Sequence, residues 1–316
     1  CAFLSTVYHW LMGGRWKELI SNIKVWNRGD QRAPHKPLLT LLLLARAQRG
    51  ESAFVSFSEI HEKLTEALRN FGPQRKSYHP EFPFWYLKND GFWTVRDADS
   101  LPYRTGKSSP TKGTLLAREV VGEVPKDLWS ELESSPSLIP QLALILLNEH
   151  WPPSLHQDLV DFLGINLSAP DAASDTLMQM VKRNPRSPEF RVEVLRAYER
   201  RCAVCGYDAR IGDALFGLEA AHIKWHAYGG ADVVPNGLAL CSLHHIAFDR
   251  GAIGIDDDLR VRVSQDVTGG DEVSRFLVDF NGAPLREPQD NALIPAAEFL
   301  NWHHKWVFRS PQRRVG

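Results

Sequence analysis

Cysteine is scarce in this chain of 316 residues, which contains four, and three of them fall within one stretch of 40. A disulfide framework needs pairs of cysteines spread over a small domain, so this distribution argues against one. Long apolar runs are also missing. The Leu-rich run Leu38–Ala45 is too short for the roughly 20 residues that cross a bilayer, and we expect a buried helix there. The apolar start, Cys1–Gly14, has neither a basic segment nor a small-residue cleavage site, so we expect no secretion signal and no membrane span.

A strong net charge is absent too, because the formal charge is −1 at pH 7 and so indicates neither an acidic nor a basic partner. The charges are unevenly distributed, however. Arg15–Arg49 holds eight basic residues against two acidic ones, and Arg69–Lys112 holds eight against four. A basic N-terminal half is typical of a surface that binds a polyanion. A solvated charged surface explains either run equally well, so the runs alone do not decide.

The length predicts about two domains. The small, polar stretch Ser168–Asp175 is the best candidate for a linker between them. Before it, Leu128–Leu167 has a helical pattern that Trp-Pro-Pro interrupts at residues 151–153. We therefore divide the chain into an N-terminal domain (residues 1–118), a helical segment with the linker (119–175) and a C-terminal domain (176–316).

Local patterns predict individual elements in both halves. Pro37 suits the first turn of a helix through the Leu-rich run. A short strand at Phe54–Phe57 and an amphipathic helix at Ser58–Asn70 should follow. Phe71–Thr94 is rich in aromatic residues and broken by Gly and Pro, which indicates loops and short strands. Pro188–Arg201 is typical of a helix, because four apolar residues fall on one face. These residues are Phe190, Val194, Ala197 and Tyr198.

Two pairs of metal-binding residues follow that helix. Cys202 and Cys205 form one Cys-x2-Cys pair, and Cys241 and His244 form a Cys-x2-His pair, with 35 residues between the two pairs. Two such pairs can supply the four ligands of a closed, tetrahedral zinc site, which leaves no position for water and is therefore structural. Unrelated buried thiols and a surface histidine are the alternative. The paired spacing favours Zn²⁺.

A second set of polar residues lies between and beside these pairs. His222 ends the strand-like stretch Leu218–Ile223, Asn236 follows 14 residues later, and His245 comes nine residues after that. With Phe248-Asp-x-Gly251 behind it, this order resembles the HNH endonuclease superfamily over roughly residues 185–255. The resemblance implies a ββα-metal fold that hydrolyses phosphodiester bonds.

The resemblance also implies roles for the three residues. His222 would be the general base that deprotonates water, and Asn236 would orient its ring or fix the loop. His245 would hold a single catalytic divalent metal, Mg²⁺ or Mn²⁺. The sequence departs from the common pattern at Ala221, where an Asp ligand often precedes the base. The nearby substitutes are Glu219, His226 and Asp249, and an exposed loop position is an equally good explanation of His226.

Two clusters in the N-terminal half carry a second resemblance. One is Arg32-Ala-Pro-His-Lys-Pro37, a basic turn before the Leu-rich helix, where backbone N–H groups and cations suit phosphate. The other is Phe71–Tyr86, which continues into Asn89–Trp93 and combines cations with aromatic and prolyl faces. The motifs Pro-His-Lys-Pro, Phe-Gly-Pro and Phe-Pro-Phe-Trp resemble the sulfur-binding domain of phosphorothioate-dependent, type IV restriction endonucleases.

In that family a shallow apolar cup receives the sulfur that replaces a backbone oxygen. Sulfur is larger and less well hydrated than oxygen, so an apolar cup favours it while cations hold the remaining charge. The resemblance implies a cup and a surrounding DNA contact made of nine residues. They are Arg32, His35, Lys36, Arg75, Tyr78, His79, Phe82, Pro83 and Tyr86. On the residues alone, such a segment is more often core and turn than a ligand cup.

The sequence thus predicts an α+β protein with a mixed N-terminal domain that reads DNA, a helical middle and a C-terminal ββα-metal domain with structural zinc. We expect a modification-dependent endonuclease that recognises phosphorothioated double-stranded DNA in a bacterial cytoplasm. Two alternatives stay open. One is an HNH nuclease for methylated or unmodified DNA, and the other is a DNA-binding module whose HNH domain is inactive. Cutting both strands requires a homodimer or two independent nicks, and the sequence does not choose.

Overall fold

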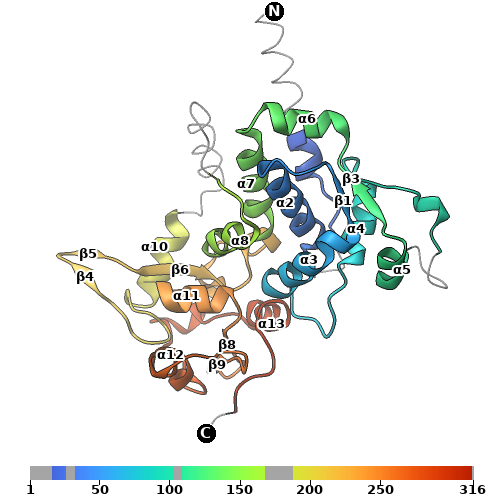
Figure 1. Ribbon diagram of the computed structural model, residues 1–316. Helices are drawn as coiled ribbons and strands as arrows, with labels where there is room; N and C mark the ends of the chain where they lie inside the picture. The colour runs from blue at the N-terminus through green and yellow to red at the C-terminus, as the bar shows by residue number, and fades with distance from the viewer. Residues whose placement is uncertain (1–15, 26–32, 103–108, 168–187, 315–316) are drawn as a thin grey trace, which may run out of the picture. The chain divides into compact units, whose positions relative to one another are not determined.

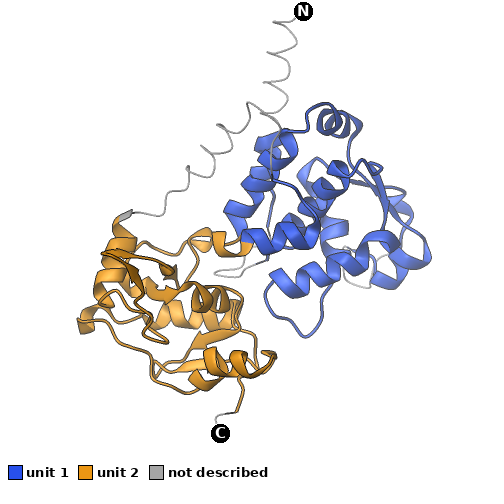
Figure 2. Ribbon diagram, turned by 60° about the vertical axis from the view of Figure 1, so that its left-hand side comes forward, with its two compact units in different colours: residues 1–28, 32–150, 156–184 blue, residues 29–31, 151–155, 185–316 orange. Residues whose placement is uncertain are grey.

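The computed structural model describes residues 16–25, 33–102, 109–167 and 188–314. The chain forms two compact units (Figure 2), one of residues 1–28, 32–150 and 156–184 and the other of residues 29–31, 151–155 and 185–316. The linker predicted at Ser168–Asp175 lies outside the described residues. None of the helices within the described ranges is long and apolar enough to cross a membrane.

The first unit is built around α2 (His35–Gln48), whose residues Leu38–Ala45 are all buried. The predicted buried helix is confirmed, although it begins two residues before Pro37, which lies in its first turn. The surrounding helices are α3 (Phe57–Phe71), α4 (Glu81–Tyr86), α5 (Lys112–Ala117), α6 (Lys126–Ser134), α7 (Leu138–His150) and α8 (His156–Leu163). Because α6, α7 and α8 pack against α2, these three helices of the middle segment belong to this unit, whereas residues 151–155 belong to the other (Figure 1).

A small antiparallel sheet completes the first unit. Its strands are β1 (Phe54–Ser56), β2 (Thr94–Val95) and β3 (Val121–Glu123), and β3 lies in the middle. Ser56 caps α3 with a capping box to Glu59, which stops the strand and starts the helix at Phe57, one residue before the predicted start. Gly122 of β3 is required because a Cβ there would lie 1.8 Å from the ring of Trp93.

The prediction of loops and short strands over Phe71–Thr94 is wrong in part. The segment contains α4 and a 3-10 turn at Leu87–Asp90, with only β2 as a strand. The helix tolerates Pro83 because this residue lies in its first turn, where a backbone N–H has no partner within the helix. The indole of Trp93 donates a hydrogen bond of 2.7 Å to the carbonyl of Phe84, which holds the turn against the helix.

The second unit contains the predicted ββα arrangement. Strand β6 (Leu218–His222) pairs antiparallel with β7 (Gly237–Cys241), and α11 (Ser242–Asp249) follows at once. The remaining elements are α10 (Pro188–Ala197), β4 (Arg210–Ile211), β5 (Ala214–Leu215), β8 (Ile253–Ile255), β9 (Val261–Val263), α12 (Asp271–Phe276) and α13 (Ala297–Trp306). The expected apolar face of α10 is confirmed, since its four predicted residues are buried in the core.

Helix α10 lies unusually close to β7. A Cβ on Gly237 would lie 2.4 Å from Cγ2 of Val194, so only glycine allows this approach. The helix ends at Ala197, four residues before the predicted end at Arg201, because Glu199 and Arg200 adopt positive φ angles of 53° and 59°. This turn leads the chain directly into Cys202.

Candidate functional site

The first cluster of the second unit consists of the four predicted zinc ligands. The donor atoms of Cys202, Cys205, Cys241 and His244 all lie within 4.8 Å of one another. The Sγ atoms of Cys205 and Cys241 are 3.9 Å apart, and Nδ1 of His244 is 3.2 Å from Sγ of Cys241 and 3.6 Å from Sγ of Cys202. In a tetrahedral site with Zn–S bonds of about 2.3 Å, the sulfur atoms lie about 3.8 Å apart. The cluster therefore has the size that Zn²⁺ requires.

The thiols and the imidazole of this cluster lie in contact and shift one another's pKa. Hydrogen bonds from Cys205 and Cys241 lower the pKa of the Cys202 thiol, and hydrogen bonds with Cys202 and Cys205 raise that of Cys241. Burial lowers the pKa of His244, but hydrogen bonds and charge from the thiols outweigh burial and raise it to about 9. Such a cluster of soft donors exchanges its protons for a cation, which is the behaviour of a structural zinc site.

The second cluster centres on His222, the last residue of β6. Its Nε2 lies 2.7 Å from Oδ1 of Asp232, and the exposed fractions of the two side chains are 6% and 28%. The ring of Phe190 stacks on the imidazole at a centroid distance of 4.1 Å and an interplanar angle of 16°. Asp232 was not among the predicted site residues. The Gly229-Gly230 pair before it, inside the loop that joins the two strands, is the signal that could have found it.

The side chain of Asn236 bonds to the backbone of the loop between the two strands. It is fully buried, and its side-chain oxygen accepts a hydrogen bond of 2.8 Å from the backbone N–H of Lys224. Its amide nitrogen donates to the carbonyl oxygens of Lys224 and Ala231 at 3.0 and 2.9 Å. These bonds tie the two ends of the loop together, with Asp232 directly after Ala231.

His245 lies on α11 between two carboxylates. Its Nδ1 is 2.6 Å from Oε2 of Glu219, and its Nε2 is 3.2 Å from Oδ2 of Asp249. The hydroxyl of Ser154, within the same unit, donates a hydrogen bond to Asp249. Burial lowers the pKa of His245, but the charges and hydrogen bonds of Asp249 and Glu219 raise it to about 9. Burial raises the pKa of Asp249, and the neighbouring His245 outweighs it and keeps that pKa low.

Ala221 is fully buried and offers no side-chain ligand for a metal. Glu219 lies two residues earlier on β6, and residues two apart on a strand point to the same face. A longer side chain on that face reaches His245, whereas His226, another of the three candidate substitutes, is exposed and packs edge-on to His222 at 6.2 Å. The geometry favours Glu219 and Asp249 as the carboxylates of this site.

The predicted DNA-binding residues of the first unit gather around α4. The ring of His79 stacks on Phe82 at 5.0 Å, and Phe82 lies 6.3 Å from Tyr86. Phe82 and Tyr86 are half-buried, whereas Pro83 is buried beneath them in the same helix. His79 is held by Glu81, whose Oε1 lies 3.0 Å from its Nδ1. This row of rings is an apolar surface with a polar edge.

The basic members of the predicted set are placed differently from one another. Arg75 is exposed, and its backbone N–H donates a hydrogen bond of 3.4 Å to the hydroxyl of Tyr78. Lys36 forms an ion pair of 2.5 Å with Asp90, whose side chain is 1% exposed. The positive charge of Lys36 is therefore already compensated within the protein. His35 is half-buried at the start of α2, and Arg32 lies outside the described residues.

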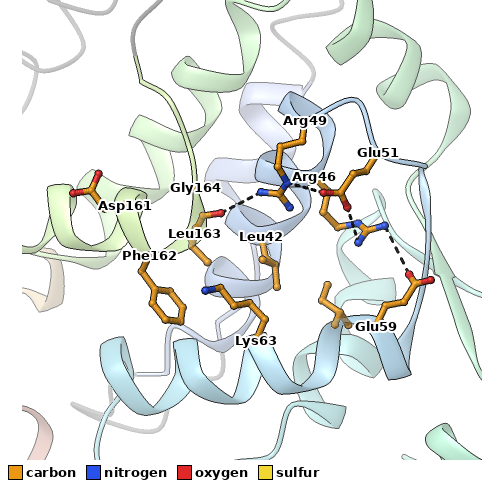
Figure 3. Close-up of a pocket in the computed structure, with 11 residues that line it drawn as sticks. Leu42, Arg46, Arg49, Glu51, Glu59, Lys63, Asp161, Phe162, Leu163 and Gly164 are labelled. Atoms are coloured by element: carbon orange, nitrogen blue, oxygen red, sulfur yellow. Dashed lines mark hydrogen bonds and ion pairs between the residues drawn. The ribbon is translucent and has the colours of Figure 1, made fainter.

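A groove of about 430 Å³ lies elsewhere on the first unit, between α2, α3 and α8 (Figure 3). Its basic groups are already paired, since Arg46 and Arg49 contact the carboxylate of Glu51 at 2.8 and 2.6 Å. Lys63 lies over the ring of Phe162 at 3.7 Å. None of the predicted DNA-binding residues lines this groove, and we assign no ligand to it.

Comparison with known proteins supports a division of roles between the two units. Residues 15–168 match the family model of the ScoMcrA-like DNA sulfur-binding domain, and residues 202–256 match that of an HNH endonuclease. These matches confirm both resemblances drawn from the sequence. The first match extends through α8, the end of the helical segment. No curated protein matches the chain.

Several solved structures are similar to parts of the chain. The sulfur-binding domain of ScoMcrA complexed with phosphorothioated DNA is 22% identical, with a TM-score of 0.42 over 46% of this chain and 97% of that one. The corresponding domain of SprMcrA is 18% identical, with a TM-score of 0.40 over 48% and 93%. The modification-dependent TagI restriction endonuclease is 26% identical, with a TM-score of 0.29 over 38% of each chain.

Proposed function

This chain joins a ScoMcrA-like DNA sulfur-binding domain to an HNH endonuclease domain, and we propose that it is a type IV restriction endonuclease that binds phosphorothioated double-stranded DNA and hydrolyses phosphodiester bonds nearby. The observation that carries this proposal is that one polypeptide matches the models of both a DNA sulfur-binding domain and an HNH endonuclease. Either part alone would leave the target or the reaction undefined.

His222 is the general base of the proposed reaction. Its imidazole takes a proton from a water molecule as the water oxygen bonds to phosphorus and the bond from phosphorus to the leaving oxygen breaks. The leaving oxygen then takes a proton from solvent, so that one water is consumed for each bond cut. Stacking on Phe190 restricts the ring to one plane, which favours a single direction of proton transfer.

The residues around His245 fit a hard divalent cation. A carboxylate and an imidazole are donors that suit Mg²⁺ or Mn²⁺. Glu219 and Nδ1 of His245 would hold the ion, with Asp249 at Nε2 orienting the ring, and a bound ion would supply positive charge for the developing charge on the phosphate. In this arrangement Glu219 takes over from the carboxylate that Ala221 lacks. Cys202, Cys205, Cys241 and His244 would hold zinc apart from this site, where it would stabilise the fold and not supply the chemistry.

The row of rings formed by His79, just before α4, and by Phe82 and Tyr86 of α4 is the proposed sulfur cup. His79, Phe82 and Tyr86 form an apolar surface. The exposed Arg75 precedes His79 by four residues in the sequence. A sulfur atom is better accommodated by rings than by water-binding groups, while a cation compensates the negative charge of the linkage. His35 and Tyr78 complete the proposed contact. The charge of Lys36 is paired with Asp90, so Lys36 would not contact DNA directly. It would instead help to hold α2 in place.

The test compares two duplexes that differ only in one Rp-phosphorothioate linkage, with several core sequences and a fixed salt concentration. Without divalent metal, we expect at least ten-fold tighter binding of the sulfur duplex, or about 1.4 kcal/mol. With Mg²⁺ or Mn²⁺, the same duplex should be cut, and His222→Ala should bind it without cutting. Equal binding of all duplexes would overturn the sulfur assignment and leave methylated or unmodified DNA as the target.

A DNA-binding module without nuclease activity is a second candidate, because Ala221 replaces a usual metal ligand. Such a module would bind the sulfur duplex equally well as wild type and as His222→Ala, and neither would cut it with either metal. Cleavage that depends on both His222 and added metal would rule this candidate out. The products would also show whether both strands are cut together, as by a homodimer, or in two independent nicks.

A further inference from the structure

We propose that Asp232 is a positioning residue of the nuclease site, which holds His222 in one tautomer and orientation, and that Asn236 serves the reaction by closing the loop that carries Asp232. This inference rests on the proposed function, in which His222 is the general base. It assigns a role to an aspartate that is absent from the His-Asn-His pattern. The side chain of Asn236 bonds to the backbone next to Asp232, and the carboxylate of Asp232 contacts the imidazole of His222.

The first step is the contact between the carboxylate and the ring. Oδ1 of Asp232 lies 2.7 Å from Nε2 of His222, a distance typical of a charge-assisted hydrogen bond. A carboxylate accepts hydrogen bonds only, so Nε2 carries the proton. In the neutral imidazole, the nitrogen that can accept a proton from water is then Nδ1. Asp232 therefore decides which nitrogen is the base.

The second step is the loop that brings Asp232 to this position. Residues 224–236 leave β6 and return to β7, and the amide of Asn236 bonds to Lys224 at one end and to Ala231 at the other. Gly230 makes the closure possible, because a Cβ there would lie 1.8 Å from the carbonyl oxygen of Lys224. Asp232 follows two residues later, so its direction is set by this closed loop.

The third step is electrostatic. When His222 accepts a proton it becomes a cation, and its side chain is 6% exposed, so water cannot stabilise that charge well. Among the described contacts of its ring, the carboxylate of Asp232 is a negative group at 2.7 Å, and the titratable His226 packs edge-on at 6.2 Å. An adjacent carboxylate favours the charged form of an imidazole and raises its pKa. The carboxylate of Asp232 thus stabilises the cation that His222 becomes during the reaction.

The experiment measures cleavage of the phosphorothioated duplex by Asp232→Asn and Asp232→Glu over a range of pH. For Asp232→Asn we expect kcat to fall by about 10²- to 10³-fold, with little change in DNA binding. The acidic limb of kcat/KM should also move to lower pH by about one unit, because the imidazole loses its anionic neighbour. Asp232→Glu should recover part of the rate. Asp213→Asn, which removes an exposed carboxylate of the same unit, is the matched control.

The outcomes separate this inference from the proposed function. If His222→Ala abolishes cleavage while Asp232→Asn keeps the wild-type rate and pH profile, the role of Asp232 is overturned and the nuclease stands. A lower rate with an unmoved acidic limb would indicate a merely structural role and would also overturn it. If wild type cuts no DNA, the proposed nuclease activity is refuted. The role of Asp232 is then tested by measuring the tautomer of His222 directly.

That direct measurement is the ¹⁵N spectrum of the histidine rings in the full chain, with the signal of His222 identified by its loss in His222→Gln. We expect the Nε2–H form in wild type and in Asp213→Asn. In Asp232→Ala the signals should shift toward a mixture of the two tautomers. An unchanged spectrum in Asp232→Ala would show that the carboxylate does not hold the ring.

Discussion

The carbonyl oxygen of Phe276 lies 3.0 Å from Nε2 of His244, whose Nδ1 faces the thiols of the zinc cluster. The Nε2–H group donates to this carbonyl, which leaves the Nδ1 lone pair for the metal. Outer hydrogen bonds of this kind orient metal-bound imidazoles and fix their tautomer. Helix α12, which ends at Phe276, therefore helps to build a site that lies 32 residues earlier in the chain.

The first prediction concerns zinc. The purified protein should contain one zinc per chain, and Cys241→Ser should lose it. Because metal binding is coupled to folding, on the order of 10 kcal/mol would be lost from the stability of the second unit. Elemental analysis and thermal unfolding measure both effects. Cys1→Ser should retain the metal, and equal zinc contents in the two variants would contradict the assignment.

The second prediction concerns the carboxylates beside His245. Asp249→Asn should lower the cleavage rate by more than about 100-fold, because it removes a buried negative charge that favours a divalent cation. Glu219→Gln should instead raise the Mn²⁺ concentration needed for half-maximal cleavage, because the side chain of Glu219 is 45% exposed and solvent can replace it. Metal titrations of cleavage give both values. Asp258→Asn, an exposed control, should titrate as wild type does.

The third prediction concerns the row of rings on α4. Phe82→Ala should remove most of the ten-fold preference for the sulfur duplex, about 1.4 kcal/mol, and leave binding of the unmodified duplex unchanged. Arg75→Ala should weaken binding of both duplexes and lower the salt dependence of binding by about one phosphate contact. Fluorescence anisotropy at several salt concentrations measures these effects. Phe54→Ala, which alters a half-buried ring on β1, should keep the preference.

The fourth prediction concerns Glu149 of α7, which is half-buried. Burial raises the pKa of its carboxyl to about 7, although a hydrogen bond with Ser21 opposes this. The folded state thus favours the protonated form, and its advantage is present below the unfolded pKa near 4.5 and is lost as the pH rises through 7. Glu149→Gln should therefore be more stable than wild type at pH 8 by about 1–2 kcal/mol, a figure reduced for partial exposure.

Urea unfolding of the two proteins at pH 5 and pH 8 checks this sign. The advantage of Glu149→Gln should grow between the two pH values. Glu62→Gln, at an exposed position on α3, should show no such growth. An advantage that is equal at both pH values would mean that the charge of Glu149 is not the cause.

The local parts of the protein could be predicted from the sequence. Ligands that are three residues apart share one turn of backbone, so Cys202 and Cys205, and likewise Cys241 and His244, come together wherever the chain goes. The apolar face of α10 follows in the same way from helical periodicity. The segment around α4 was harder, because proline and glycine suggest loops unless one knows that Pro83 lies in a first turn.

Contacts between distant residues were decided by the tertiary structure alone. Asp232 reaches His222 only because the amide of Asn236 closes the loop between them. Lys36 is paired with Asp90, 54 residues away, so a cation that resembled a phosphate ligand already has a partner. The sequence by itself determined which chemical groups the nuclease has, since their types and spacings are local. Only the packing of strands, loops and helices decided which group faces which, because that depends on the three-dimensional path of the chain.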